Sequence, residues 1–308
     1  MLDLFLFTFS VSKVTTRIFL PSLVAFIVSF FTSMGGVSGA FILLPFQMSV
    51  LGYISPSVSG TNQLFNIIAI PSGVWGYIKE KRMVWPLTWA VIIGTLPGVF
   101  IGAWIRLEYL PDAKNFKIFA GFILLYIGLK LLIDLFQKKT GVQAHLPKKM
   151  GDFVITATHF SLQQAGFTFQ GQEYAFSVPR IILLCFIVGI IGGIYGIGGG
   201  AIITPFLVAF FRLPIYAVAG AALMGTFVTS IAGVILYQIL AIFYAEISVA
   251  PDWYLGTLFG IGGFLGMYLG AKCQKHVPAK IIQAILCCCI LFIAVQYTLM
   301  PLVNRLCD

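Results

Sequence analysis

Two matching stretches of this sequence decide how the chain is organised: GVSGAFILLPF at residues 36–46 and GIGGGAIITPF at residues 196–206. They align without a gap, and the same offset matches Gly60 with Gly220, Gly73 with Gly233, and Tyr77 with Tyr237. After a small shift, Gly94, Gly98 and Gly102 meet Gly262, Gly266 and Gly270. An ordered series of matches at a nearly constant offset indicates a duplication, so the chain contains two homologous repeats.

The composition places both repeats in a membrane. Only 9% of the 308 residues are charged, and the mean hydropathy is +1.00, whereas soluble domains have about 25% charged residues. Residues 18–78 contain no Asp, Glu, Lys, Arg or His. These values exclude an ordinary soluble enzyme, a disordered chain and a disulfide-stapled secreted domain. Because lipid allows only helices or closed barrels to cross it, and the apolar runs lack strand-like alternation, we expect an all-α polytopic membrane protein.

Each repeat is predicted to open with a helix that a glycine-rich stretch interrupts. The expected helices are residues 18–34, 37–51, 57–78, 84–105 and 116–136, then 181–197, 200–211, 214–244, 251–272 and 280–303. Residues 18–51 are too long for one straight crossing and too short for two ordinary ones. Gly35-Gly36 and Gly198-Gly199-Gly200 therefore indicate a broken helix or a re-entrant pair. One crossing per break gives eight spans in parallel repeats, and two crossings give ten spans in inverted repeats of five helices each.

The chain divides into four segments by these criteria. Residues 1–17 are an N-terminal segment, 18–136 the first transmembrane repeat, 137–179 a polar loop, and 180–308 the second transmembrane repeat. Partial alternation of apolar and polar residues in the polar loop, with Gly166 and Gly171 as turn candidates, favours a small β-hairpin. Lys and Arg collect in cytoplasmic loops, and both the eight-span and the ten-span counts place the polar loop in the cytoplasm.

The two glycine breaks are the best candidates for a binding site. A break in a membrane helix exposes main-chain N–H groups at a partly positive helix end, and paired breaks near the midplane are a common transporter site. Tight packing of small residues is the structural alternative. With nearby neutral donors, the candidate substrate-binding residues are Ser33, Gly35, Gly36, Ser38, Gly39, Thr61, Asn62, Gln63, Asn66, Gly196, Gly198, Gly199, Gly200, Thr226, Thr229 and Ser230.

The paired motifs resemble those of the TauE/SafE sulfite exporter family, within the toluene-sulfonate uptake permease superfamily. Each motif is followed by a helix rich in small residues, SGTNQ at 59–63 and AGAA at 219–222. The resemblance covers residues 18–301, and its stronger half is residues 196–205. The first motif departs from it, because Ser38-Gly39-Ala40 stands where the second has three glycines. The resemblance implies secondary transport of sulfite, an organosulfonate such as sulfoacetate, or a related sulfur oxyanion.

These observations predict a transporter of a small sulfur-containing anion in the bacterial inner membrane that works by alternating access. An anion channel and a structural or assembly protein remain the alternatives. We expect no enzymatic activity, no cofactor, no bound metal and no nucleic-acid partner. Coupling to H⁺ or Na⁺ and a homodimer stay open. Arg106 and Arg212 lie at segment ends, where they attract an anion to the entrance or anchor the chain to headgroups.

Overall fold

The computed structural model describes residues 6–34, 37–136, 155–169 and 171–273, with residues 284, 287, 288 and 290–298 near the C-terminus. The first half contains α1 (Leu20–Met34), α2 (Ala40–Ser49), α3 (Ser57–Lys79), α4 (Trp85–Glu108) and α5 (Ala113–Phe136). The second contains α6 (Val178–Tyr195), α7 (Ile203–Phe211), α8 (Ile215–Phe243) and α9 (Trp253–Cys273). Residues 290–298 are also helical. The strands are β1 (Leu6–Thr8), β2 (Thr15–Arg17), β3 (Ile155–Phe160), β4 (Gln164–Phe169) and β5 (Gln172–Ser177).

The protein is a mostly helical membrane protein. Four helices among the described residues are long and apolar enough to cross a bilayer: Trp85–Glu108, Val178–Tyr195, Ala217–Phe243 and Trp253–Cys273. The 23-residue α3 is also long enough, but Thr61, Asn62, Gln63 and Asn66 lower its hydropathy. Helices α1 and α2 have 15 and 10 residues, so they resemble the two arms of an interrupted crossing.

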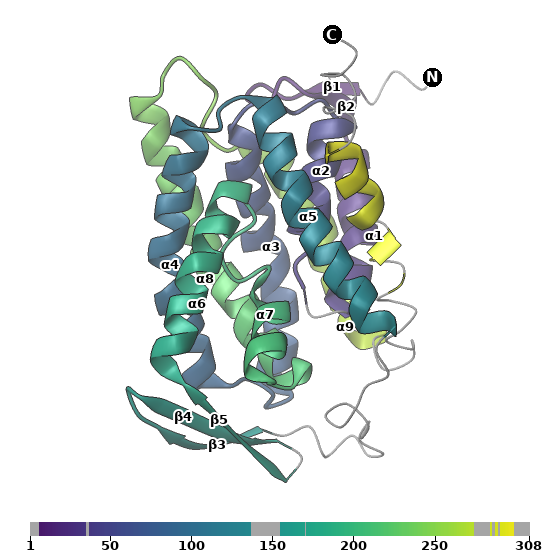
Figure 1. Ribbon diagram of the computed structural model, residues 1–308. Helices are drawn as coiled ribbons and strands as arrows, with labels where there is room; N and C mark the ends of the chain where they lie inside the picture. Colours follow the sequence, from purple (N-terminus) through teal and green to yellow (C-terminus); the bar gives the residue numbers. More distant parts are fainter. Residues whose placement is uncertain are drawn as a thin grey trace.

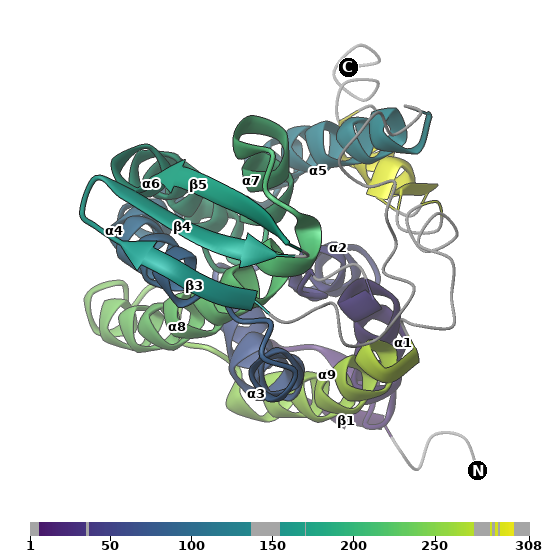
Figure 2. The same cartoon turned by 90° about the horizontal axis from the view of Figure 1, so that it is seen from below.

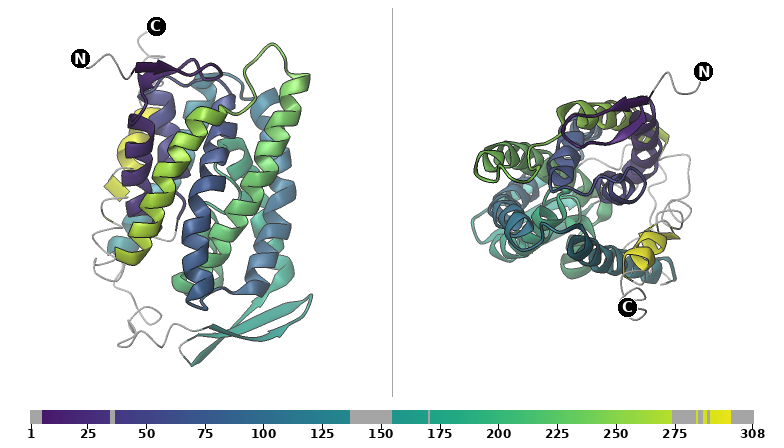
Figure 3. Two further views of the ribbon diagram at one scale, coloured as in Figure 1. Left: turned by 180° about the vertical axis from the view of Figure 1, so that it is seen from behind. Right: turned by 90° about the horizontal axis from the view of Figure 1, so that it is seen from above.

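The two halves enter the bundle from opposite ends. The β1–β2 hairpin meets the α8–α9 loop at one end, where the Ser12 N–H donates to Asp252 Oδ2 at 3.0 Å; we call this the hairpin end (Figure 1). Strands β3–β5 lie at the other, the sheet end, where the Ile155 N–H donates to Lys81 O at 3.1 Å. Helix α1 starts at the hairpin end and α6 at the sheet end (Figure 3). This agrees with the inverted arrangement and not with parallel repeats.

Glycine stripes set the distance between helices, and the same packing occurs twice. In α4, Gly94, Gly98 and Gly102 lie against the main chain of Ile182, Phe186 and Ile190 in α6. In α9, Gly262, Gly266 and Gly270 lie against the main chain of Ser22, Phe26 and Phe30 in α1. Likewise Gly60 packs on Tyr237, and Gly220 packs on Tyr77. The α4–α6 and α1–α9 pairs thus use the same kind of close main-chain contact, as do the two ends of the α3–α8 pair.

A three-stranded antiparallel sheet, in the order β3-β4-β5, covers the ends of α4 and α6 (Figure 2). It has one strand more than the predicted hairpin. Gly171 turns the chain between β4 and β5 with φ +74°, whereas Gly166 lies inside β4 and makes no turn. Phe167, Phe169 and Phe176 are buried on the sheet. Residues 137–154 of the predicted polar loop lie outside the described residues.

Candidate functional site

The second break, residues 196–202, reverses the chain between α6 and α7. Gly196 ends α6 with φ +76° and its N–H donates to Gly192 O at 2.9 Å. Gly198 has φ +82°. Only glycine adopts such backbone angles readily, which explains both glycines. Helix α7 then runs back toward the sheet end (Figure 1).

The chain also reverses between α1 and α2, and residues 37–39 are the described part of the first break. The Val37 N–H donates to Thr32 O at 3.2 Å, and the Leu43 N–H donates to Gly39 O at 3.0 Å. Gly39 faces α1, where an added Cβ would lie 3.1 Å from Val28 and 3.2 Å from the Ser29 hydroxyl. Gly35 and Gly36, both candidate residues, lie outside the described residues.

Asn62 of α3 connects the two breaks. Its Nδ2 donates to Ala40 O, at the start of α2, at 3.1 Å and to Gly196 O at 3.2 Å. Its Oδ1 accepts a hydrogen bond from Gln47 Nε2 of α2 at 3.2 Å. One amide group therefore donates to main-chain carbonyls from both halves of the chain. Buried breaks need such partners, because unpaired main-chain polar groups are costly away from water.

Asn66, one helical turn further along α3, makes a second connection. Its Nδ2 donates to Ile197 O at 2.9 Å and to Ser230 Oγ at 3.2 Å, and its Oδ1 accepts from Ser38 Oγ at 2.5 Å. Asn66 is the tenth residue of α3, so it lies about 14 Å from the start of this helix, close to its middle. The two breaks thus meet deep inside the bundle.

Helix α8 provides the other wall of the second break. The Gly199 N–H donates to Thr229 Oγ1 at 3.2 Å, and Gly200 lies against Ala222 and Thr226. The Thr226 and Thr229 hydroxyls also donate to carbonyls one turn earlier in their own helix, at 2.8 Å each. Their hydroxyls are therefore satisfied within α8 and also line the break.

Main-chain donors remain unused at the breaks. No hydrogen bond within the described part of the chain uses the N–H groups of Gly39, Gly198 or Gly200. The side chains around them, Ser38, Asn62, Asn66, Thr226, Thr229 and Ser230, are 0% exposed. The N-termini of α2 and α7, which have partial positive charge, begin within a few residues of these donors. The arrangement is a buried, electropositive and uncharged site.

Three candidate residues lie elsewhere. Ser33 Oγ donates to Phe30 O in its own helix at 3.2 Å and packs on α9. Thr61 Oγ1 accepts from the Asp252 N–H at 2.8 Å and ties α3 to the hairpin end. Gln63 lies on another face of α3, against Gly233 of α8.

Sequence reasoning missed two residues that support the breaks. Gln47 binds Asn62, and the Tyr195 hydroxyl donates to Phe41 O at 3.1 Å. A single Gln in the apolar α2 was the available signal for Gln47. Arg212 is exposed, but Arg106, expected at the entrance or among headgroups, is 0% exposed.

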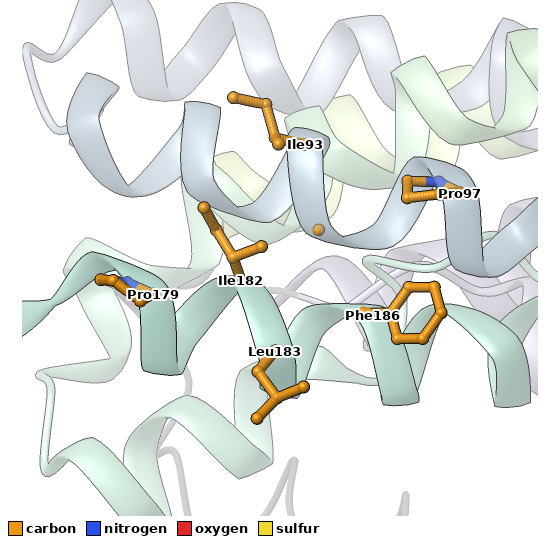
Figure 4. Close-up of a pocket in the computed structure, with 7 residues that line it drawn as sticks. Ile93, Pro97, Pro179, Ile182, Leu183 and Phe186 are labelled. Atoms are coloured by element: carbon orange, nitrogen blue, oxygen red, sulfur yellow. The ribbon is translucent and has the colours of Figure 1, made fainter. Parts of the chain in front are cut away.

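A groove of about 380 Å³ lies between α4 and α6. Its walls are Ile93, Gly94, Pro97, Pro179, Ile182, Leu183 and Phe186 (Figure 4). None of these side chains can bind an anion, and Ile93 and Leu183 are exposed on the outside of the bundle. In a membrane, apolar surface of this kind faces lipid.

Comparison with known proteins identifies the family. A profile of the family described as Sulfite exporter TauE/SafE matches residues 22–297. The chain is 25% identical over 276 residues to "Probable membrane transporter protein YunE" of Bacillus subtilis (strain 168), covering 86% of this chain and 91% of the relative. It is 30% identical over 103 residues to "Probable membrane transporter protein YdhB" of the same organism, covering 33% and 39%. No solved structure matches the chain. The chain therefore belongs to the TauE/SafE family of multi-pass membrane transporters and is a transporter rather than an enzyme.

Proposed function

We propose that this protein is a secondary transporter of a small sulfur oxyanion, sulfite or an organosulfonate such as sulfoacetate, in the bacterial cell membrane. The observation that carries the proposal is the meeting of the two breaks through Asn62 and Asn66, with unused N–H groups beside them. Membership of the sulfite exporter family supports the substrate class.

The chemistry of the breaks suits an anion. Main-chain N–H groups and helix N-termini bind oxyanions without a formal charge, and transporters with broken helices use them near the membrane midplane. The hydroxyls of Ser38, Thr226 and Thr229 donate to protein acceptors in this structure. An anion that displaced those bonds would receive neutral donors, which are less costly to bury than a charge. In this proposal the candidate residues around the breaks bind the substrate, and Ser33 and Thr61 support the packing.

The packing around the breaks supports alternating access as the mechanism. The site is closed to both ends in this structure, since its polar side chains are buried. The first break is held by hydrogen bonds to α3, and the second by hydrogen bonds to α3 and α8. Neither is held by continuous helix, so their main chains can exchange partners as one half moves against the other. Opening toward one end at a time would then expose the same donors in turn.

The test is flux through the purified protein in liposomes. We expect saturable uptake of radiolabelled sulfite or sulfoacetate, and no uptake of these anions by protein-free vesicles. Absence of uptake for every sulfur oxyanion tried would overturn the proposal. If voltage steps gave currents that did not saturate with substrate concentration, the protein would be an anion channel and alternating access would be wrong.

A pair of matched variants tests the site itself. Thr229 and Thr257 both donate to a carbonyl one turn earlier, at 2.8 and 2.7 Å, but only Thr229 also accepts the Gly199 N–H. Thr229→Val should lower uptake about fivefold, the effect of one lost hydrogen bond. Thr257→Val, on α9, should leave uptake unchanged. Equal uptake by the two variants would contradict a role of the second break.

A further inference from the structure

A second group of polar side chains lies beside the breaks, between α3, α4 and α8. Its members are Ser59 and Gln63 on one face of α3, Tyr237 on α8 and Arg106 on α4, and all four are 0% exposed. Gln63 packs on Gly233, one turn before Tyr237. The Tyr237 hydroxyl faces Ser59, but the pair does not reach hydrogen-bond geometry. We call these four residues the Arg106 cluster.

The guanidinium of Arg106 has no polar partner within the part of the chain that the structure describes. Among the described residues, none of its three nitrogens makes a hydrogen bond, and no carboxylate forms an ion pair with it. Its Cζ lies 3.8 Å from the centre of the Phe116 ring. An aromatic ring offsets only part of the penalty for burying a cation. The carboxyl group of Asp112, the acidic neighbour, is used at the start of α5, where it accepts the Lys114 and Asn115 N–H groups at 3.1 Å each.

The Arg106 cluster adjoins the second break through Ser59, and the ring beneath the Arg106 guanidinium lies beside Tyr195 at the end of α6. Ser59 fills the space in front of Gly196, so closely that a Cβ at Gly196 would collide with the Ser59 side chain. The Phe116 ring lies 6.2 Å from the ring of Tyr195, the residue before Gly196. An anion that leaves the break toward the hairpin end therefore meets the Arg106 cluster.

The duplication provides an internal comparison. The alignment matches Ser59 with Ala219 and Gln63 with Leu223, and Leu223 packs on Gly73 as Gln63 packs on Gly233. At the sheet end, Tyr77 takes the place that Tyr237 has at the hairpin end. Arg82 lies over the Tyr77 ring and forms an ion pair with Glu80. Packing thus needs only apolar residues at these positions. Among the described residues, the counterparts of Ser59 and Gln63 on the sheet side are apolar, and the arginine beside Tyr77 is in an ion pair, whereas Arg106 is not.

We propose that the Arg106 cluster is a second anion subsite, on the hairpin side of the second break, that binds the oxyanion substrate before or after it occupies the breaks. The proposal rests on the proposed function. A guanidinium can donate two parallel hydrogen bonds to a sulfonate or sulfite group. Ser59, Tyr237 and the Gln63 amide supply neutral donors around it.

The experiment uses purified full-length protein, sulfite as the probe, and chloride as the control anion. In Arg106→Met, the apolar stem still packs on Phe116, but the charge is absent. We expect the unfolding temperature without sulfite to rise, because an unpaired buried charge is gone. The sulfite-dependent rise in this temperature should become smaller at a given sulfite concentration, because only the site at the breaks remains. The sulfite concentration for half-maximal uptake should increase about 30-fold. Arg106→Lys should retain part of the sulfite response.

The outcomes separate the two proposals. If the parent protein takes up no sulfur oxyanion that is tried and is stabilised by none, the proposed function fails. If the parent transports and Arg106→Met keeps the same half-saturating concentration, the Arg106 subsite is wrong and the proposed function stands. Should Arg106→Met fail to fold, the double variant Ser59→Ala, Gln63→Leu decides, because it installs the residues found at the equivalent positions. An unchanged half-saturating sulfite concentration in this double variant would also overturn the proposed subsite.

Discussion

Asn66→Ala is the sharpest test of how the breaks are held together. The substitution removes two donated hydrogen bonds, to Ile197 O and Ser230 Oγ, and one accepted from Ser38 Oγ. In water-soluble proteins each bond would contribute about 1 kcal/mol. Hydrogen bonds between membrane helices average about 0.6 kcal/mol, so three should contribute about 2 kcal/mol. That corresponds to about a 30-fold change in the ratio of folded to unfolded protein.

The assay is reversible unfolding of the purified protein in mixed micelles, with the midpoint converted to a free energy of unfolding. Ser72→Ala is the control, since the Ser72 hydroxyl, also on α3, donates only to Ala69 O of its own helix at 2.9 Å. We expect a loss of about 2 kcal/mol for Asn66→Ala and less than about 0.5 kcal/mol for Ser72→Ala. Substrate uptake should fall for Asn66→Ala alone.

Equal stability of the two variants would refute the reasoning, because it would mean that Asn66 does not hold the breaks. A large loss of stability with full uptake per folded molecule would instead separate the structural role of Asn66 from transport. In that case, the main-chain N–H groups of the breaks, and not the Asn66 amide, would bind the substrate.

Three further results are expected. Gly98→Ala should abolish folding, because the added Cβ would meet the main chain of α6. At Gly76 an added Cβ has no other heavy atom within 4 Å, so Gly76→Ala should raise the free energy of unfolding by up to about 1 kcal/mol. Unfolding curves of both variants check this. Basic residues favour the cytoplasm, so we expect the sheet end to be cytoplasmic. A cysteine introduced at Gln163, at the sheet end, should therefore resist a membrane-impermeant thiol reagent in whole cells, whereas one at Lys13, at the hairpin end, should react. The reverse labelling pattern would mean that the topology is inverted. Sulfite at about 100 times its dissociation constant should stabilise the parent by about 2.7 kcal/mol, measured as a rise in unfolding temperature.

Local sequence determined the class and the positions of the elements. A chain with so few charges can only fold in lipid as helices or a barrel, and the helices observed agree with the predicted ranges to within a few residues at most boundaries. The glycine series also had a direct physical meaning, because helices that touch along their main chains need residues without a Cβ, such as Gly98 and Gly266. The two breaks were visible for the same reason: Gly196 and Gly198 adopt backbone angles that other residues avoid.

The tertiary structure alone decided the orientation of the halves and the partners of the polar residues. The same sequence pattern fits parallel and inverted repeats, since the direction of α6 depends on where the chain re-enters. Asn62 and Asn66 could be assigned to the breaks, but their bonds to Gly196 and Ile197 join residues more than 130 positions apart, and helical spacing has no information about such contacts. Arg106 shows the limit most clearly. Its place near a helix end indicated an exposed cation, whereas α5 and α8 fold over it and bury it, because burial depends on which elements pack together and not on position along a helix.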